Sequence, residues 1–332
     1  MTDLARRKLL PFSAAWPLVG GVTLGLVLRL AFNDGPEALG GRSLSGLYAM
    51  AGSFVYLAPF AVGALTGWLT ERLQRRSLLR HFAAGAAANA LVVLATLVIQ
   101  IEGLICAILV VPLFSLVGGF GAIAMALICR ASRHPGPPMA AFAVLPLLMA
   151  GVEAPLALPD DFGLVTAERL VAAPPERIWS QLMDTSAIRP EEVADGWMYR
   201  IGVPLPLFGV VERQGPLLVR HVEMGKGIHF DQIASDWEEG REVRWTYRFT
   251  ANSFPSGALD DHVRIGGRHF DVLDTVYTME PRGAQTLLRV SMRYRVSTRF
   301  NWYAEPLARG LIGNFEEVVL RLYARRAEGD AG

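Results

Sequence analysis

The sequence predicts an α-helical transmembrane bundle of four to five helices, followed by an α+β domain in which a curved antiparallel sheet holds a long C-terminal helix. Three patterns predict this fold class. Residues 12–129 contain long uncharged apolar runs, residues 160–296 alternate like strands between Gly- and Pro-containing turns, and residues 298–326 keep the apolar spacing of one helix face. We place the membrane domain at 1–158 and the second domain at 159–332, on either side of a Pro- and Asp-containing linker.

The C-terminal helix is predicted to be strongly one-sided. Apolar residues recur three and four positions apart from Phe300 to Tyr323, whereas the opposite face is predicted to carry Glu305, Arg309, Asn314, Glu316, Arg321 and Arg325. A helix of this kind needs a large apolar surface to lie on, and the preceding strands offer one. We therefore expect the sheet to clasp the helix and to leave a cavity between them.

Composition excludes some functions. Of 332 residues, 52% are hydrophobic and 19% are charged, below the roughly 25% charged residues of an ordinary soluble domain. The net charge of +1 predicts no nucleic-acid partner, because binding to a duplex needs a concentrated basic face. The two cysteines, Cys106 and Cys129, lie in one apolar run and cannot pair within a single helix.

The first domain contains four runs near the length of about 20 apolar residues that a bilayer requires: 12–32, 44–69, 81–101 and 104–129. A fifth run, 139–158, is weaker because it contains Pro146, Glu153 and Pro155. Glu153 is an ionisable residue near the end of a possible span, which makes it a functional hypothesis. Its place near an interface favours simple helix packing instead.

The loops predict an orientation in a bacterial inner membrane. From the N-terminus, successive loops carry 3, 1, 4, 0 and 2 Lys and Arg residues. Positive residues gather on the cytoplasmic side, so we expect a cytoplasmic N-terminus. The second domain is extracytoplasmic if residues 139–158 span the membrane and cytoplasmic if they do not. The sequence favours a span.

The second domain is predicted to begin with a strand at 162–171 and a helix at 172–184 that is opened by Pro174 and Pro175. Further strands are expected at 196–203, 210–224, 227–237, 242–250, 270–280 and 286–296. In the last strand, apolar residues at even positions from Leu288 to Val296 predict one buried face, with arginines on the other face.

Residues 162–327 resemble the SRPBCC superfamily, also called START-like or polyketide cyclase and lipid-transport-like. The resemblance rests on VTAERLVAAPPERIWSQLMD (165–184), the following strands and the final amphipathic helix. It implies a helix-grip fold, a seven-stranded sheet curled around the last helix, with a cavity for lipids, sterols, plant hormones or polyketide intermediates. Some members act on aromatic substrates. The combination with membrane helices resembles membrane-tethered bacterial proteins of this class, which implies no reaction.

The segment 250–270 is predicted to be a loop, and a loop of this length is usually a lid or a binding loop. A solvated excursion is the alternative. Candidate cavity or lid residues are Trp197, Tyr199, Trp237, Trp245, Tyr247, Phe254, Leu259, Tyr277 and Phe315. Ordinary core packing is the equal alternative for the aromatic residues.

Histidine and aspartate recur in and near this loop. Acid–base catalysis could use Asp261, His262, His269 and Asp271. A metal could be held by two HxD pairs, in which i and i+2 share a strand face: His229, Asp231, His269 and Asp271. Phe230 and Phe270 point the opposite way from these pairs and favour the core, so the His and Asp side chains are expected to face water.

Strand arginines are numerous: Arg220, Arg244, Arg248, Arg289, Arg293 and Arg295. We expect them to coat the outer face of the sheet. Any that turned inward could pair with a ligand carboxylate or phosphate. No phosphate-binding loop, nucleophile elbow, HExxH or CxxC motif occurs in the sequence, so no cofactor is predicted.

Three functions remain open from the sequence. The favoured hypothesis is an integral membrane protein whose second domain binds a membrane lipid or another small hydrophobic molecule without catalysis. The second is a cyclase- or hydrolase-type enzyme that uses the His and Asp residues of the loop. The third is a membrane-tethered sensor or assembly module.

Overall fold

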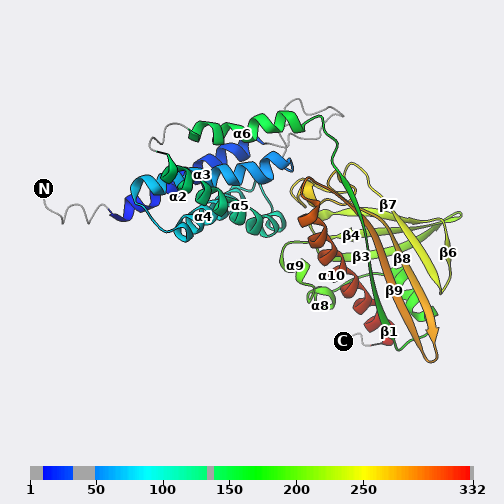
Figure 1. The fold of residues 1–332 in the computed structure, drawn as a ribbon. Coiled ribbons are helices and arrows are strands. Elements are labelled where there is room, and N and C mark those ends of the chain that lie inside the picture. The colour runs from blue at the N-terminus through cyan, green and yellow to red at the C-terminus, as the bar shows by residue number, and fades with distance from the viewer. Residues whose placement is uncertain (1–9, 33–48, 133–137, 330–332) are drawn as a thin grey trace. The chain divides into compact units, whose positions relative to one another are not determined.

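The computed structural model describes residues 10–32, 49–132 and 138–329. The chain divides into two compact units, unit 1 over Met1–Leu158 and unit 2 over Pro159–Gly332 (Figure 1). Unit 1 is helical in its described residues, and unit 2 is built around one antiparallel sheet.

The apolar runs of unit 1 form helices. Their bounds are α2 (Leu10–Ala31), the π-helical turn η1 (Ser53–Leu57), α3 (Ala58–Leu73), α4 (Leu78–Val98), α5 (Leu104–Ala131) and α6 (Pro138–Glu153). Among the described residues, three helices are long and apolar enough to cross a membrane: Ser53–Leu73, Leu78–Val98 and Leu104–Ala131. The fifth predicted run ends at Glu153 instead of residue 158, because Pro155 disfavours helical backbone in the residue before it. The start of the second run, 44–48, lies outside the described residues.

Glycines let the helices of unit 1 approach closely. A Cβ placed on Gly63 would lie 1.9 Å from the carbonyl oxygen of Gly118, and one on Gly85 would lie 2.4 Å from the same atom. The backbones of α3 and α4 therefore touch α5 directly, as small residues allow between helices in lipid.

Polar contacts gather at the two ends of the bundle. At one end, Arg29 pairs with Glu102 at 2.6 Å, and the Glu153 carboxylate accepts bonds from the Ser53 amide (3.0 Å) and hydroxyl (3.2 Å). Because Ser53 begins the α3 segment, the C-terminus of α6 lies beside the start of that segment.

At the other end of the bundle, the Glu71 carboxylate contacts Arg130 Nε at 3.0 Å and His81 Nε2 at 3.0 Å. Glu71 is near the end of α3, and Arg130 is near the end of α5. Helix α6 begins seven residues after α5 ends and finishes beside Ser53. It therefore runs from the end marked by Arg130 to the end marked by Glu153.

The sheet of unit 2 has the strand order β1-β9-β8-β7-β5-β4-β3-β2, with β6 paired to β7 and all pairs antiparallel. The strands are β1 (Asp160–Val171), β2 (Asp184–Thr185), β3 (Pro206–Gln214), β4 (Leu217–Met224), β5 (His229–Ala234), β6 (Trp237–Glu238), β7 (Glu242–Arg248), β8 (Phe270–Arg282) and β9 (Gln285–Ser297). The helices are α7 (Pro175–Met183), α8 (Pro190–Val193), α9 (Trp197–Arg200) and α10 (Asn301–Glu328).

The predicted fold class is confirmed, because the curled sheet grips α10. Figure 1 shows α10, in red, beside β1 and β9, and both strands contact it. Leu288, Val290 and Tyr294 on β9 are completely buried in one core with Val319 and Tyr323 of α10. Burial of a side chain this large contributes about 1.5–3 kcal/mol, so this contact stabilises the unit.

Two predicted strands differ in the structure. Residues 196–203 form α9 and a turn, in which Gly202 has a positive φ of 108° and the Met198 amide donates to Asn314 of α10. These residues therefore pack against the last helix instead of pairing in the sheet. Residues 210–224 form parts of two strands, because Gly215, with φ of 61°, makes a turn between β3 and β4.

Glu316 was predicted on the exposed face of the last helix, and this was wrong. Its side chain is completely buried. On a helix it shares a stripe with Ile312, four residues before it, and Leu320, four residues after it, and both of these are buried. The helix buries a wider face than the sequence indicated.

Candidate functional site

The start of β1, the start of α10 and the long loop between β7 and β8 all lie at one end of the sheet. Asp160 pairs with Ser297, and Phe270 pairs with Val296, so the start of β1, the end of β9 and the start of β8 lie together. The loop 249–269, which connects β7 to β8, is therefore at the end where the chain enters unit 2 and where α10 begins. We call this the loop end of the sheet.

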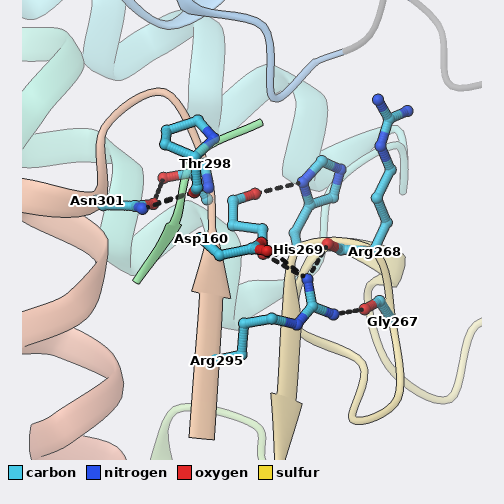
Figure 2. A network of polar contacts seen from close by, with 9 residues as sticks. Asp160, Gly267, Arg268, His269, Arg295, Thr298 and Asn301 are labelled. Carbon is cyan, nitrogen blue, oxygen red and sulfur yellow. Dashed lines mark hydrogen bonds and ion pairs between the residues drawn. The ribbon is translucent and has the colours of Figure 1, made fainter. Parts of the chain in front are cut away.

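A polar network fastens the loop to this end of the sheet (Figure 2). Arg295 donates to the backbone carbonyl oxygens of Gly267 (2.9 Å) and Arg268 (3.2 Å) and lies 3.4 Å from the Asp160 carboxylate. The Ser297 hydroxyl donates to the same carboxylate at 2.5 Å, and with Arg295 it holds the pKa of Asp160 below its usual value. One guanidinium thus joins the loop to the first residue of β1.

The candidate catalytic residues lie near this network. His269 is only 8% exposed, and its Nδ1 is 3.1 Å from the Ser297 carbonyl oxygen. The rings of His262 and His269 are 6.0 Å apart. The Asp271 carboxylate accepts the Gly266 amide at 2.8 Å, and burial raises the pKa of Asp271. The side chain of Asp261 is outside the described part of the chain.

The expectation that His269 faces water was wrong. Strand β8 begins at Phe270, so His269 precedes the strand and the alternation of strand faces does not apply to it. His269 is instead held under the end of β9, whose Ser297 amide donates to the His269 carbonyl oxygen at 2.9 Å.

The four residues of the metal alternative are not brought together. His229 and Asp231 lie on β5, which β7 separates from His269 and Asp271 at β8. Asp231 is engaged by His221 Nδ1 (2.7 Å) and by Arg248 (2.8 Å). Among the described residues, no group of three or more His, Cys, Asp and Glu residues could hold a metal ion.

His229 and Asp231 instead help to line an open depression of about 580 Å³ on the outer face of the sheet. Its lining comes from β3, β4 and β5: Phe208, Val210, His221, Val222, Glu223, His229, Phe230 and Asp231. The depression is separated from α10 by the thickness of the sheet, so it is distinct from the interior that the fold encloses.

The loop packs onto an aromatic cluster at the loop end. The rings of Phe230, Tyr247, Phe249 and Phe254 are spaced 5.5–6.2 Å from one another in successive contacts. Leu259 packs on the same group. The loop is thus not a solvated excursion, and three of the predicted lid or cavity residues, Tyr247, Phe254 and Leu259, meet here.

The remaining predicted cavity residues are dispersed. Trp245 and Tyr277 are buried deep in the core, and Phe315 is a half-buried residue of α10 packed against it. Trp237 lies against Trp179, with ring centroids 6.3 Å apart. Two residues lie outside the interior: Trp197 is 44% exposed, and Tyr199 packs in a separate cluster with Val193 and Val318.

Sequence reasoning placed Arg220 on the outer face of the sheet, and this was wrong. Its side chain is 7% exposed and points inward, where Nη2 donates to the Tyr323 hydroxyl (2.8 Å) and to Thr185 Oγ1 (3.1 Å). Nη1 makes a long contact of 3.5 Å with Gln232 Oε1. A Cβ on Gly209 would lie 2.7 Å from both Nε and Nη2, so the glycine provides the space that the guanidinium occupies.

Arg220 is surrounded by phenols. Burial lowers the pKa of Arg220, but the oxygens of Tyr323 and Tyr277 outweigh this effect and hold it above its ordinary value. Burial raises the pKa of Tyr247 to about 12 and also raises that of Tyr277 well above its ordinary value. Both phenols are therefore neutral near pH 7, and Arg220 is a buried cation among neutral groups.

Glu316 also faces this interior. Burial raises the pKa of Glu316 to about 8, and the nearby Met292 amide offsets only part of this effect. Neither carboxyl oxygen makes a hydrogen bond of ordinary geometry. Near pH 7 the side chain is mainly the neutral acid. Tyr277 lies within electrostatic range of both Glu316 and Arg220.

Comparisons with known proteins show likeness only at low identity and over about half of the chain. No protein-family model matches the sequence, and no curated protein matches it. A START superfamily protein from Mycobacterium smegmatis is 18% identical over 51% of this chain and 99% of its own, with a TM-score of 0.34. The Zhui aromatase/cyclase from Streptomyces sp. R1128 is 14% identical over 52% of this chain and 99% of its own, with a TM-score of 0.31.

A third solved structure, a protein from Thermus thermophilus, is 17% identical over 51% of this chain and all of its own, with a TM-score of 0.32. At these identities and scores we draw no conclusion about function from the likeness. The helix-grip fold of unit 2 rests on its own strand order and on the burial of α10 against the sheet.

Proposed function

We propose that unit 2 binds a lipid or similar amphiphile between α10 and the sheet, without catalysis, and that unit 1 anchors it in a membrane. The observation that carries this proposal is the uneven closure of the interior. Inward-facing side chains are buried at one end of the sheet, whereas at the loop end Phe230 and Val296 are buried but other inward-facing side chains are partly exposed.

The contrast can be followed along single strands. On β4, the inward-facing Leu218 is buried, whereas Val222 is partly exposed. On β7, Val243 and Trp245 are buried, whereas Tyr247 is partly exposed. The open end is therefore lined by apolar and aromatic groups, which is the chemistry of a site for an apolar ligand.

The same change occurs along α10. Val319 and Tyr323, toward its C-terminus, are buried, whereas Ala304, Ala308 and Phe315, nearer its N-terminus, are partly exposed although they pack toward the core. Ala304 and Ala308 each contribute only a methyl group to the contact between the helix and the core. The loop with Phe254 and Leu259 covers this end and would have to move for a ligand to enter.

Unit 1 supports the membrane part of the proposal. Large apolar side chains on its helices are exposed, among them Val98 (72%), Leu94 (52%) and Phe120 (54%). Exposed apolar surface of this extent on three membrane-length helices is favourable in lipid and unfavourable in water. The chain then enters unit 2 at the loop end, so the covalent link joins the apolar helices to the more open end of the sheet.

The test is to recover the ligand with unit 2 after it has folded in the whole protein. A protease recognition sequence is inserted between α6 and β1, the full chain is produced in membranes, and unit 2 is released by cleavage. Solvent extraction and mass spectrometry of the released unit are expected to yield a bound amphiphile. A folded unit that carries no ligand, and takes up none from added lipid vesicles, would contradict the proposal.

A further inference from the structure

Arg220 gives the chemical class of the ligand. This inference rests on the proposed function of the same interior. We propose that the ligand is an apolar acid with one terminal carboxylate, which binds head inward against the Arg220 guanidinium with its apolar body directed toward the loop end.

The first step is the missing counter-ion. The hydrogen-bond partners of Arg220 are the hydroxyls of Tyr323 and Thr185 and the amide of Gln232, all of them neutral. Glu316 is not among the partners of Arg220 in the described part of the chain. Removing an ion from water costs several kcal/mol unless an opposite charge compensates. A ligand that brings one negative charge would supply that compensation.

The second step is the donor that remains for the ligand. Nη2 is used by Tyr323 and Thr185, and Nε lies against Gly209 without a hydrogen-bond partner. Nη1 carries two hydrogens and makes only the 3.5 Å contact with Gln232. It is therefore the nitrogen that can donate to a ligand oxygen.

The third step is the position of the head group. Arg220 is four residues from Met224 at the loop end of β4, which corresponds to about 13 Å along a strand. A head bound at this depth must be at the end of its molecule, as a carboxylate is in a fatty or aromatic acid. A phosphodiester carries substituents on both sides and does not suit this position.

Net charge also distinguishes a carboxylate from a phosphate monoester as the terminal head group. One guanidinium neutralises one carboxylate, whereas a phosphate monoester carries about −1.5 to −2 near pH 7 and would leave charge uncompensated in the interior. Tyr247 is level with Arg220 in the sheet, because both pair with Gln232. The other rings of the aromatic cluster, Phe230, Phe249 and Phe254, lie nearer the loop end, where the apolar body of the ligand would pack.

The experiment uses the full chain in nanodiscs of phosphatidylcholine. Two photoreactive probes of equal length, a diazirine fatty acid and the matching fatty alcohol, are added at equal concentration and crosslinked. Labelling of peptides from β4, β5, β7 and α10 is measured by mass spectrometry. We expect the acid to label unit 2 at least about tenfold more than the alcohol, which is the effect of one charge-assisted contact of about 1.4 kcal/mol.

Substitutions test whether Arg220 causes the preference for the acid over the alcohol. In Arg220→Gln the acid and the alcohol are expected to label within about twofold of each other, whereas Arg289→Gln, on the outer face of β9, keeps the wild-type ratio. If Arg220→Gln fails to fold, Gly209→Ala decides the question. It keeps the charge but places a methyl group 2.7 Å from Nε, so we expect the preference for the acid to fall.

The outcomes separate this inference from the function on which it rests. Equal labelling by acid and alcohol in the wild-type protein would overturn the carboxylate assignment and leave an apolar-ligand function standing. A preference that survives both Arg220→Gln and Gly209→Ala would overturn the assignment to Arg220. A photoreactive alkyl phosphate that labels more strongly than the acid would overturn the monoanionic head. Labelling of unit 2 by none of the probes would contradict the proposed function itself.

Discussion

Arg220 and Arg289 show how the position of a residue on a strand decides its role. Both are strand arginines, but Arg289 pairs with Glu168 at 3.1 Å on the outer face, whereas Arg220 points into the core. The sequence contained the signal, because Leu218 and Val222 flank Arg220 at i−2 and i+2 and are apolar. An arginine in an apolar series faces the interior. Its partners, Thr185 and Tyr323, are distant in sequence and required the structure.

The pH dependence of stability tests the burial of Glu316. Its folded pKa of about 8 is above the usual value of 4.5, so the folded state binds the extra proton between these values. The associated stability is complete below about pH 4.5 and is lost as the pH rises through about 8. We expect Glu316→Gln to remove this loss and to make unit 2 more stable than wild type, by up to a few kcal/mol, at pH 9. Hydrogen exchange of unit 2 in the full chain measures the effect.

The neighbouring residue provides the control for this prediction. Glu317 is on the same helix turn and is 65% exposed, so Glu317→Gln should leave the pH profile unchanged. A Glu316→Gln variant with the same loss of protection as wild type between pH 6 and pH 9 would show that the carboxyl is hydrated.

At the scale of elements, one side chain makes several of the contacts that hold the loop 249–269. Arg295 is the side chain that joins its carbonyl oxygens at Gly267 and Arg268 to Asp160 (Figure 2). We expect Arg295→Gln to increase the hydrogen-exchange rate of the loop at least severalfold while the amides of β8 and β9 stay protected, because the sheet ladder does not depend on this side chain.

Arg289→Gln on the same strand is the matched control for the loop, since Arg289 bonds to Glu168 and does not reach the loop. Unchanged exchange in the loop of Arg295→Gln would mean that the aromatic contacts of Phe254 hold the loop by themselves. Faster exchange in both variants would indicate general loosening of β9.

The sequence predicted an element correctly where the whole segment lies in one environment. In β9 every second residue from Leu288 to Val296 meets the core, so strict alternation is visible. The prediction of a strand at 196–203 failed because α9 packs on α10, and contact with a distant helix leaves no regular period in the sequence. The prediction that Glu316 is exposed failed because a helix enclosed by a sheet also buries the edges of its apolar face. The apolar residues Phe254 and Leu259 indicated that part of loop 249–269 packs, but not that it packs on Phe230 and Tyr247.

At the scale of the whole molecule, the contacts of unit 1 bear on its orientation. Helix α6 runs from the bundle end marked by Arg130 and Glu71 to the end marked by Ser53 and Glu153. The first end is rich in arginine, which favours the cytoplasmic side. We therefore expect α6 to cross the membrane and unit 2 to lie outside the cytoplasm.

Fusions to a phosphatase that is active only outside the cytoplasm measure this orientation. A fusion after residue 160 should be active, and a fusion after Arg76, in the arginine-rich loop between α3 and α4, should be inactive. The reverse pattern of activity would place unit 2 in the cytoplasm and the arginine-rich end outside it, which would contradict the expected orientation.

The most direct measurement is the amount of ligand that unit 2 carries when a large side chain replaces a small one between α10 and the core. Ala308 faces the core from α10, whereas Gly310 has no neighbouring atom within 4 Å of an added Cβ. Units released from full-length wild type, Ala308→Trp and Gly310→Trp are compared by native mass spectrometry. The account predicts bound amphiphile in wild type and Gly310→Trp and none above background in folded Ala308→Trp. Equal ligand in Ala308→Trp and wild type, or a wild-type unit that is empty, would contradict it.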